Sequence, residues 1–264
     1  MTERLQTNGL LPSVCIDAVL AEVEPSEAIS MVAEAGIGAF EFWSWWDKDL
    51  ESLVQARDRW GVQIAACCTR FVSLVDPSRR AEYLQGLQDS LEVARRLDCR
   101  TLISQVGDEL VGVPRKLQHA SLVEGLQAAA PLLEKAGITL VIEPLNLLVD
   151  HPGYYLARSE EAFEIVDEVQ SERVRVVFDI YHQQITEGQV TATIVKQIEK
   201  IGHFHAAGNP GRHELSVGEL HYPHILEAIG ATAYQGFVGL EYWPLKDPQS
   251  GLREVADWFG CFRA

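Results

Sequence analysis

The stretch VRVVFDIYH, residues 174–182, decides the fold, because in it an apolar run ends in the acidic Asp179. In three other stretches an apolar run also ends near a potential metal ligand. ITLVIEPLN (138–146) carries Glu143, IGHFHAAG (201–208) carries His205, and GFVGLEYWP (236–244) carries Glu241. Short apolar runs of this kind are typical of buried parallel strands. An ionised carboxylate at the end of such a run is costly to desolvate unless it is paired or bound to a cation. We therefore interpret the four residues as ligands of one divalent metal ion.

Outward from these stretches, apolar runs alternate with longer amphipathic segments, which is the rhythm of repeated βαβ units. The predicted strands are residues 12–16, 38–43, 62–69, 100–106, 138–145, 174–180, 201–206 and 236–242. Right-handed crossovers close eight such units most simply into an α/β fold, a single (β/α)8 TIM barrel domain over residues 1–264. An open doubly wound sheet is disfavoured because no GxGxxG turn follows the first strand.

Proline, serine and glycine residues predict where the helices begin and end. Helix starts are expected at Pro25, just after Pro77, and at Ser159, which we interpret as an N-cap. Helix ends are expected at four glycines, Gly36, Gly61, Gly137 and Gly202. The longest irregular stretch, residues 146–158, follows the fifth strand, and in a barrel such loops line the mouth of the active site.

Composition excludes several classes of protein. The formal net charge of −16 opposes binding to nucleic acid or to an anionic membrane, and no cluster of Lys and Arg offsets it. No stretch approaches the ~18 apolar residues that a membrane span needs, and the amino terminus lacks the pattern of an export signal. The five scattered cysteines indicate reduced thiols rather than a disulfide framework, so we expect a cytoplasmic protein.

Strand alternation predicts that the four candidate ligands meet. His203 and His205 lie on one face of their strand and Phe204 on the other, so the histidines can point into the barrel. The same alternation lets Glu143, Asp179 and Glu241 face the barrel axis at the carboxyl ends of their strands. Three oxygen ligands and one nitrogen favour Mn²⁺, Mg²⁺ or Co²⁺ as the single divalent cation.

At this point the motifs resemble a known family. They are IEPLN at 142–146, DHPGYYL at 150–156, DIYHQQ at 179–184, NPGRHE at 209–214, GE at 218–219 and EYWP at 241–244. They resemble the hydroxypyruvate isomerase family, which belongs to the xylose isomerase-like TIM barrels. The resemblance is specific over residues 140–244 and weaker before them, where AFEFW around Glu41 is similar.

The resemblance implies roles for individual residues. Glu143, Asp179 and Glu241 take the family's metal-binding carboxylate positions, and Glu143 and Glu241 its two acid/base positions. His205 departs from the pattern, because hydroxypyruvate isomerases usually have glutamine there, whereas ketose 3-epimerases have histidine. Trp243 also departs, since it stands where a lysine is expected.

Four further residues are candidates for binding a small hydroxy-carbonyl substrate: His182, Arg212, Glu41 and Asn146. His182 either bonds a substrate hydroxyl, supports a metal ligand or packs in its loop. Arg212 either pairs with a substrate carboxylate or is an ordinary loop arginine. Glu41 is expected to orient His182 or the substrate, with a salt bridge as the alternative. The tryptophans after Glu41 either wall the pocket or pack between loops or subunits.

The chemistry of these groups leads to one main hypothesis and three alternatives. Two glutamates beside a cation suit the interconversion of hydroxy-carbonyl compounds through a cis-enediolate, with hydroxypyruvate and tartronate semialdehyde as the model pair. A ketose 3-epimerase is the second enzyme hypothesis. An endonuclease for abasic DNA is disfavoured by the net charge of −16. A non-catalytic sugar-binding barrel is the alternative from another class, and a homo-oligomer is left open.

Overall fold

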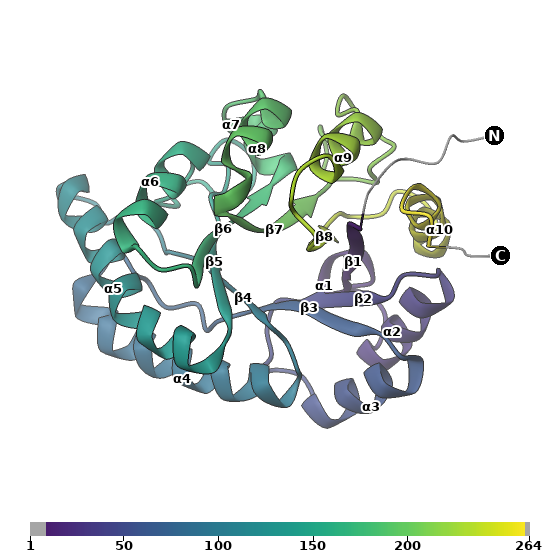
Figure 1. The fold of residues 1–264 in the computed structure, drawn as a ribbon, viewed down its shortest axis with the longest axis horizontal. Helices are drawn as coiled ribbons and strands as arrows, with labels where there is room; N and C mark the ends of the chain where they lie inside the picture. Colours follow the sequence, from purple (N-terminus) through teal and green to yellow (C-terminus); the bar gives the residue numbers. More distant parts are fainter. Residues whose placement is uncertain (1–8, 262–264) are drawn as a thin grey trace.

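A closed barrel of parallel strands forms the centre of the molecule, and helices form a ring around it (Figure 1). The computed structural model describes residues 9–261. Within them the strands pair in chain order from β1 to β8, and β8 closes the barrel by pairing with β1. This confirms the predicted (β/α)8 barrel.

Each of the eight predicted strands is found in the described part of the chain, within two residues of its expected ends except for β5, which ends three residues early. They are β1 Leu11–Cys15, β2 Ala39–Phe42, β3 Gln63–Cys68, β4 Thr101–Ser104, β5 Thr139–Ile142, β6 Val174–Asp179, β7 Ile201–Ala206 and β8 Phe237–Leu240. The parallel register of β6 and β7 pairs Asp179 with His205, which brings two of the candidate ligands side by side.

The helices fill the connections between the strands. They are α1 Ile16–Val19, α2 Pro25–Glu34, α3 Leu50–Trp60, α4 Arg80–Arg96, α5 Arg115–Ala136, α6 Ser159–Val169, α7 Ile180–Thr186, α8 Val190–Gln197, α9 Tyr222–Gly230 and α10 Pro248–Trp258, with short 3-10 turns at Pro77–Arg79 and Ile198–Lys200. Local chemistry explains several of these boundaries. The Asp49 carboxylate caps the start of α3, and Gly61 ends that helix in the left-handed conformation.

Two boundary predictions are wrong. Ser159 is the first residue of α6 and not its N-cap; its hydroxyl donates instead to the Glu187 carboxylate. Gly202 ends no helix, because it lies in β7. A Cβ atom at Gly202 would come within 2.7 Å of the Val141 side chain, so its glycine serves close packing of neighbouring strands rather than a turn.

The barrel has two apolar regions, one on the outer face of its strands and one on the inner face. The larger one lies where the helices pack on the strands and includes Phe40, Leu102, Leu140 and Phe204. A small separate cluster consists of Ala66, Cys68, Ile103, Val141 and Val177. Because strand side chains alternate between the two faces, this small cluster belongs to the inner face of β3 to β6. The inner face of β1, β2 and β7 carries polar groups instead, among them Ser13, Glu41 and His203.

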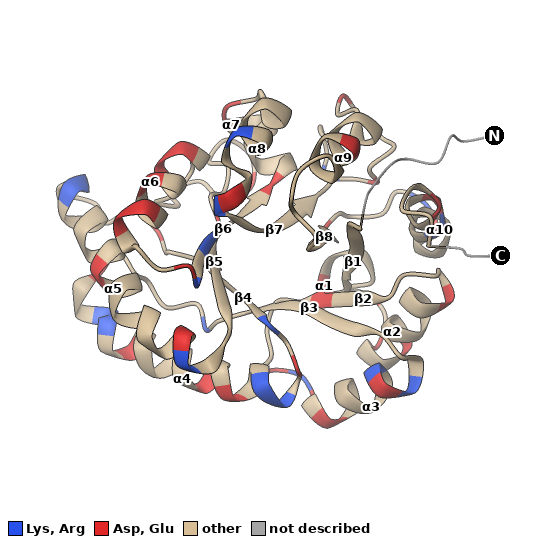
Figure 2. Ribbon diagram, in the orientation of Figure 1, with Lys and Arg blue, Asp and Glu red and all other residues tan. Residues whose placement is uncertain are grey.

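Charged residues are spread around the outer ring of helices rather than gathered on one segment (Figure 2). None of the helices in residues 9–261 has the length and apolar content needed to span a membrane. All five cysteines are free thiols, and four of them are buried, as the sequence predicts.

Candidate active site

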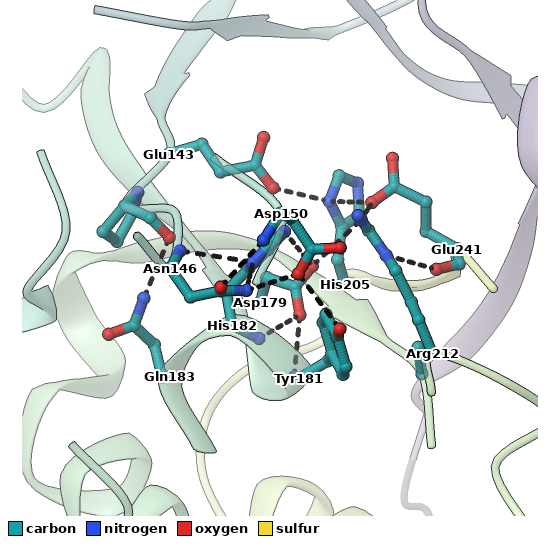
Figure 3. Close-up of polar contacts among 12 residues, drawn as sticks. Glu143, Asn146, Asp150, Asp179, Tyr181, His182, Gln183, His205, Arg212 and Glu241 are labelled. Atoms are coloured by element: carbon teal, nitrogen blue, oxygen red, sulfur yellow. Dashed lines mark hydrogen bonds and ion pairs between the residues drawn. The ribbon is translucent and has the colours of Figure 1, made fainter. Parts of the chain in front are cut away.

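The four predicted ligands converge at the carboxyl ends of the strands (Figure 3). Glu143 directly follows β5, Asp179 is the last residue of β6, His205 lies near the end of β7, and Glu241 directly follows β8. One ligand atom from each lies within 4.8 Å of the other three. All four side chains are buried. The prediction that these residues meet is therefore confirmed by the geometry.

In this cluster His205 directs its Nδ1 at the carboxylates of Glu143 and Glu241. Its Nδ1 lies 2.9 Å from Glu143 Oε1 and 3.7 Å from Glu241 Oε2. Three carboxylates and one imidazole converging from four strands make a donor set that fits a hard divalent cation. Because so much negative charge is buried in one place, the cluster needs positive charge to balance it.

The pKa values of Glu143 and Glu241 are shifted in opposite directions. Burial raises the pKa of Glu143, although the charge of His205 opposes this. Burial also tends to raise the pKa of Glu241, but the positive charges of His205 and Arg212 outweigh it, so the pKa of that carboxyl is lowered overall. The environments of two carboxyl groups that flank one cleft therefore differ, which is the arrangement expected for an acid and a base.

The charges around His205 favour its protonated form. Burial favours its neutral form, but the negative charges of Glu241, Glu143 and Glu41 raise its pKa well above the usual range. A cation that takes the Nδ1 lone pair of His205 must therefore displace a proton.

Glu41 supports the cluster from one layer deeper in the barrel. Its carboxylate accepts hydrogen bonds from Ser13 Oγ at 2.7 Å and from His203 Nε2 at 3.0 Å, and it lies 3.0 Å from His205 Nε2. Room for it comes from Gly239, where a Cβ atom would come within 2.3 Å of the Glu41 carboxylate. Among the described contacts of Glu41 none is with His182, so that alternative is wrong.

Asn146 holds His182 in one orientation. The Asn146 side-chain amide donates to His182 Nδ1 at 2.7 Å and to Asp150 Oδ2 at 2.6 Å. Because His182 Nδ1 accepts, the proton of the neutral ring lies on Nε2, which has no hydrogen-bond partner among the described residues. Asn146 is itself fully buried behind the ring. The structure thus places Asn146 where it positions His182, and direct contact of Asn146 with substrate stays a prediction.

Arg212 reaches the same cluster from the loop after β7. Its guanidinium forms an ion pair with the Glu241 carboxylate and lies 3.7 Å from Asp179 Oδ2. Its backbone carbonyl accepts a hydrogen bond from the Trp243 amide at 2.8 Å, which fixes the loop against the segment after β8. Arg212 is therefore an integral part of the site and not an exposed loop arginine.

A cavity of about 340 Å³ opens above the cluster. Its walls are formed by Trp43, Cys68, Phe71, Ile103, Gln105, Glu143, Leu145, Asp150, His151, His182, His205, Arg212, Glu241 and Trp243. Sequence reasoning gave no role to His151, Asp150, Phe71 or Gln105. The DHPGYYL motif that begins at Asp150 could have pointed to the first two, whereas nothing in the sequence marks Phe71 or Gln105.

Fold and site together define a class: a (β/α)8 barrel with a carboxylate and histidine cluster at the end of the barrel where such enzymes carry their active sites. The family model of the xylose isomerase-like TIM barrel matches residues 29–260. The chain belongs to this family.

Curated relatives are isomerases. Hydroxypyruvate isomerase of Escherichia coli K12 is 36% identical over 187 residues, which cover 71% of this chain and 70% of that protein. The 2-oxo-tetronate isomerase of Cupriavidus necator H16 is 35% identical over 184 residues, which cover 70% of each chain. The predicted resemblance to hydroxypyruvate isomerases is confirmed, and this chain is an enzyme of the isomerase class.

Solved structures show the same architecture. A family 2 AP endonuclease from Brucella melitensis matches with a TM-score of 0.89 and 30% identity, over 95% of this chain and 99% of that one. D-psicose 3-epimerase from Clostridium cellulolyticum H10 matches with a TM-score of 0.82, over 95% of this chain and 98% of that one. The epimerase is 18% identical, so it shows the fold alone.

Proposed function

We propose that this enzyme interconverts small hydroxy-carbonyl compounds of the hydroxypyruvate and tartronate semialdehyde type, with one divalent cation as cofactor. The convergence of Glu143, Asp179, His205 and Glu241 on one point carries the proposal. These four residues would hold the cation, and their oxygen-rich donor set favours Mn²⁺, Mg²⁺ or Co²⁺. When bound, the cation would stabilise the negative charge that develops on the two oxygens of a cis-enediolate.

The two glutamates carry the proton in this proposal. A carboxylate removes the proton from the hydroxymethyl carbon of hydroxypyruvate, and the electron pair of that C–H bond forms the enediolate double bond. Delivery of a proton to the neighbouring carbon then gives tartronate semialdehyde. Glu143 and Glu241 come from β5 and β8 and stand on either side of His205, so both can reach the reacting carbons.

The remaining polar groups bind and orient the substrate. His182 lines the cavity, and its Nε2–H makes no hydrogen bond to a described residue, with Asp179 Oδ2 at 3.5 Å, so it can donate to a substrate oxygen. Arg212 can pair with a substrate carboxylate through its planar guanidinium. Asn146 and Glu41 act through their neighbours, because one holds the ring of His182 and the other contacts His205.

A ketose 3-epimerase is the second candidate. His205 favours it, since the resemblance associates histidine at this position with epimerases. Carboxylates on both sides of the site would also allow a proton to leave one face of a carbon and return on the other. Activity on abasic DNA is disfavoured. The net charge is −16, and Arg212, already paired with Glu241, is the one Lys or Arg among the described residues lining the cavity.

The deciding experiment compares substrates on the purified protein loaded with Mn²⁺. We expect hydroxypyruvate to be converted to tartronate semialdehyde, with loss of activity on chelation and recovery on adding Mn²⁺ back. Free ketoses, followed for epimerisation at the third carbon, are the comparison. Faster turnover of the ketoses would replace the isomerase by the epimerase. A protein that takes up no metal and turns over neither substrate would favour the non-catalytic alternative.

Metal affinity is expected to fall as the pH is lowered. The raised pKa of His205 means that its proton must leave when a cation binds, so a release of one proton weakens binding about tenfold per pH unit. Calorimetric titration of Mn²⁺ in buffers of different ionisation enthalpy measures both the affinity and the released protons. The matched variant His205→Gln has no such proton to lose, and we expect a shallower pH dependence. Equal slopes in the two proteins would contradict this account.

A further inference from the structure

The cavity has two chemically different walls. One consists of the catalytic cluster with His182, Asp150, His151 and Arg212 around it. The other is formed by residues without charge: Trp43, Cys68, Phe71, Ile103, Leu145 and Trp243. A volume of about 340 Å³ is within the range of ~300–1,000 Å³ found for sites that hold drug-sized ligands. A three-carbon acid bound at the cluster would leave the apolar wall uncovered.

The aromatic side chains of this wall are fixed in place by neighbours. Trp43 Nε1 donates to Glu241 Oε1 at 2.6 Å, which puts the indole ring directly beside a catalytic glutamate. The Trp243 ring meets the Trp43 ring edge to face, with centroids 6.0 Å apart. The Trp243 backbone is held on both sides, because its amide donates to Arg212 and its carbonyl contacts His213 Nδ1 at 2.8 Å.

Phe71 forms the other side of the apolar mouth. Its ring packs edge to face on Trp46 at 5.1 Å, and Trp46 packs on Trp45 at 5.6 Å. The Arg70 guanidinium lies over the Trp45 and Trp46 rings, so its charge is directed at these rings. Yet Phe71 remains 53% exposed and Trp243 41% exposed. Two large aromatic surfaces are thus held open to the cavity at its entrance, where a ligand can cover them.

We propose that the substrate carries, beyond its reacting hydroxy-carbonyl carbons, a neutral tail with a flat apolar face that packs against Trp43, Trp243 and Phe71. This rests on the proposed function, because the cluster must hold the reacting end. The tail is neutral because the aromatic residues that receive it carry no charge, and Arg212, the one Lys or Arg among the described residues lining the cavity, is already paired with Glu241. The substrate class is therefore hydroxy-ketones and hydroxy-aldehydes with an aromatic end.

Two ketones that differ only in the tail provide the test. Hydroxyacetone, which is methyl hydroxymethyl ketone, and benzyl hydroxymethyl ketone undergo the same isomerisation to a hydroxy-aldehyde. With the Mn²⁺-loaded enzyme we expect kcat/KM to be about tenfold or more higher for the benzyl compound, as for groups that fill an apolar pocket. We call the ratio of kcat/KM for the benzyl compound to kcat/KM for hydroxyacetone the benzyl preference. In Trp243→Ala and in Phe71→Ala the benzyl preference should fall toward one, mainly through a higher KM for the benzyl compound.

The control variant is Leu148→Ala, because Leu148 is an 82% exposed apolar residue of the loop after β5 that does not line the cavity. It should keep the wild-type preference. A benzyl preference of one or less in the wild-type enzyme overturns the proposal. The proposal is also overturned if Trp243→Ala binds metal normally and shows the same benzyl preference as the wild type.

Failure of this inference and failure of the proposed function give different results. If hydroxypyruvate is converted but the benzyl ketone is neither bound nor converted, the inference is wrong and the isomerase stands. If no hydroxy-carbonyl compound is converted, yet calorimetry shows that the benzyl ketone binds and that Trp243→Ala weakens this binding, the isomerase proposal fails and the apolar subsite stands.

Discussion

Replacing Glu143 or Glu241 by glutamine is expected to lower kcat by about 10²–10⁴-fold, because each change removes a proton-transfer group with almost no change in volume. Both side chains are buried in the cluster, and their oxygens face His205. Turnover of hydroxypyruvate by each variant at saturating Mn²⁺ measures the effect. Because both glutamates are also proposed metal ligands, the metal content of each variant must be determined in the same preparation.

The charge-matched control is Glu160→Gln. Glu160 lies in the first turn of α6 with a side chain that is 75% exposed, so the change alters net charge without touching the site. We expect this variant to retain wild-type turnover. If Glu143→Gln or Glu241→Gln keeps near-normal turnover with the metal bound, that glutamate has no part in proton transfer.

Arg212→Ala is expected to weaken the binding of a carboxylate substrate by about 2–5 kcal/mol, the usual effect of truncating one partner of a buried charge pair. The guanidinium lies at the cluster and is the one Lys or Arg among the described residues that line the cavity. The effect should appear as a higher KM for hydroxypyruvate. A neutral substrate such as hydroxyacetone should be much less affected.

Arg212→Ala should also move the acid limb of the pH profile. The charge of Arg212 helps to lower the pKa of Glu241, so without it the pKa of that carboxyl rises. An ionised Glu241 is needed to accept a proton, and activity on the acid side should therefore be lost at a higher pH than in the wild type. Arg212→Lys keeps a positive charge and is expected to show a smaller displacement. Unchanged hydroxypyruvate kinetics in Arg212→Ala, together with ready epimerisation of ketoses, would favour the epimerase.

The predictions that succeeded rest on local chemistry. Apolar runs of strand length predicted all eight strands, and Asp179 and Glu241 could be placed at strand ends because parallel strands present their carboxyl ends at one edge. Local patterns were less reliable where packing overrides them. Gly202 looked like a helix end but lies in β7, because the close approach of Val141 requires a residue without a side chain.

The partners of the supporting residues could not be predicted. Asn146 was predicted only as a substrate ligand, and its bond to His182 could not be foreseen. Glu41 was expected to orient His182 or the substrate or to form a salt bridge, and it contacts His203 and His205. Glu41 and His203 are 162 residues apart in the chain, and Trp43 and Glu241 are 198 apart. Such pairs meet only because β8 closes on β1 and the strands adopt one stagger.

By itself, the sequence determined the βα rhythm, the inward face of each strand and the four residues that end up at one level of the barrel. These properties depend on periods of two and 3.6 residues, which operate within a few residues of chain. Tertiary structure alone decided which carboxylate each nitrogen of His205 faces, how Arg212 reaches Glu241, and that Phe71 and Trp243 share one cavity. Those outcomes depend on barrel closure and on loop conformation, and neither is encoded in a local pattern.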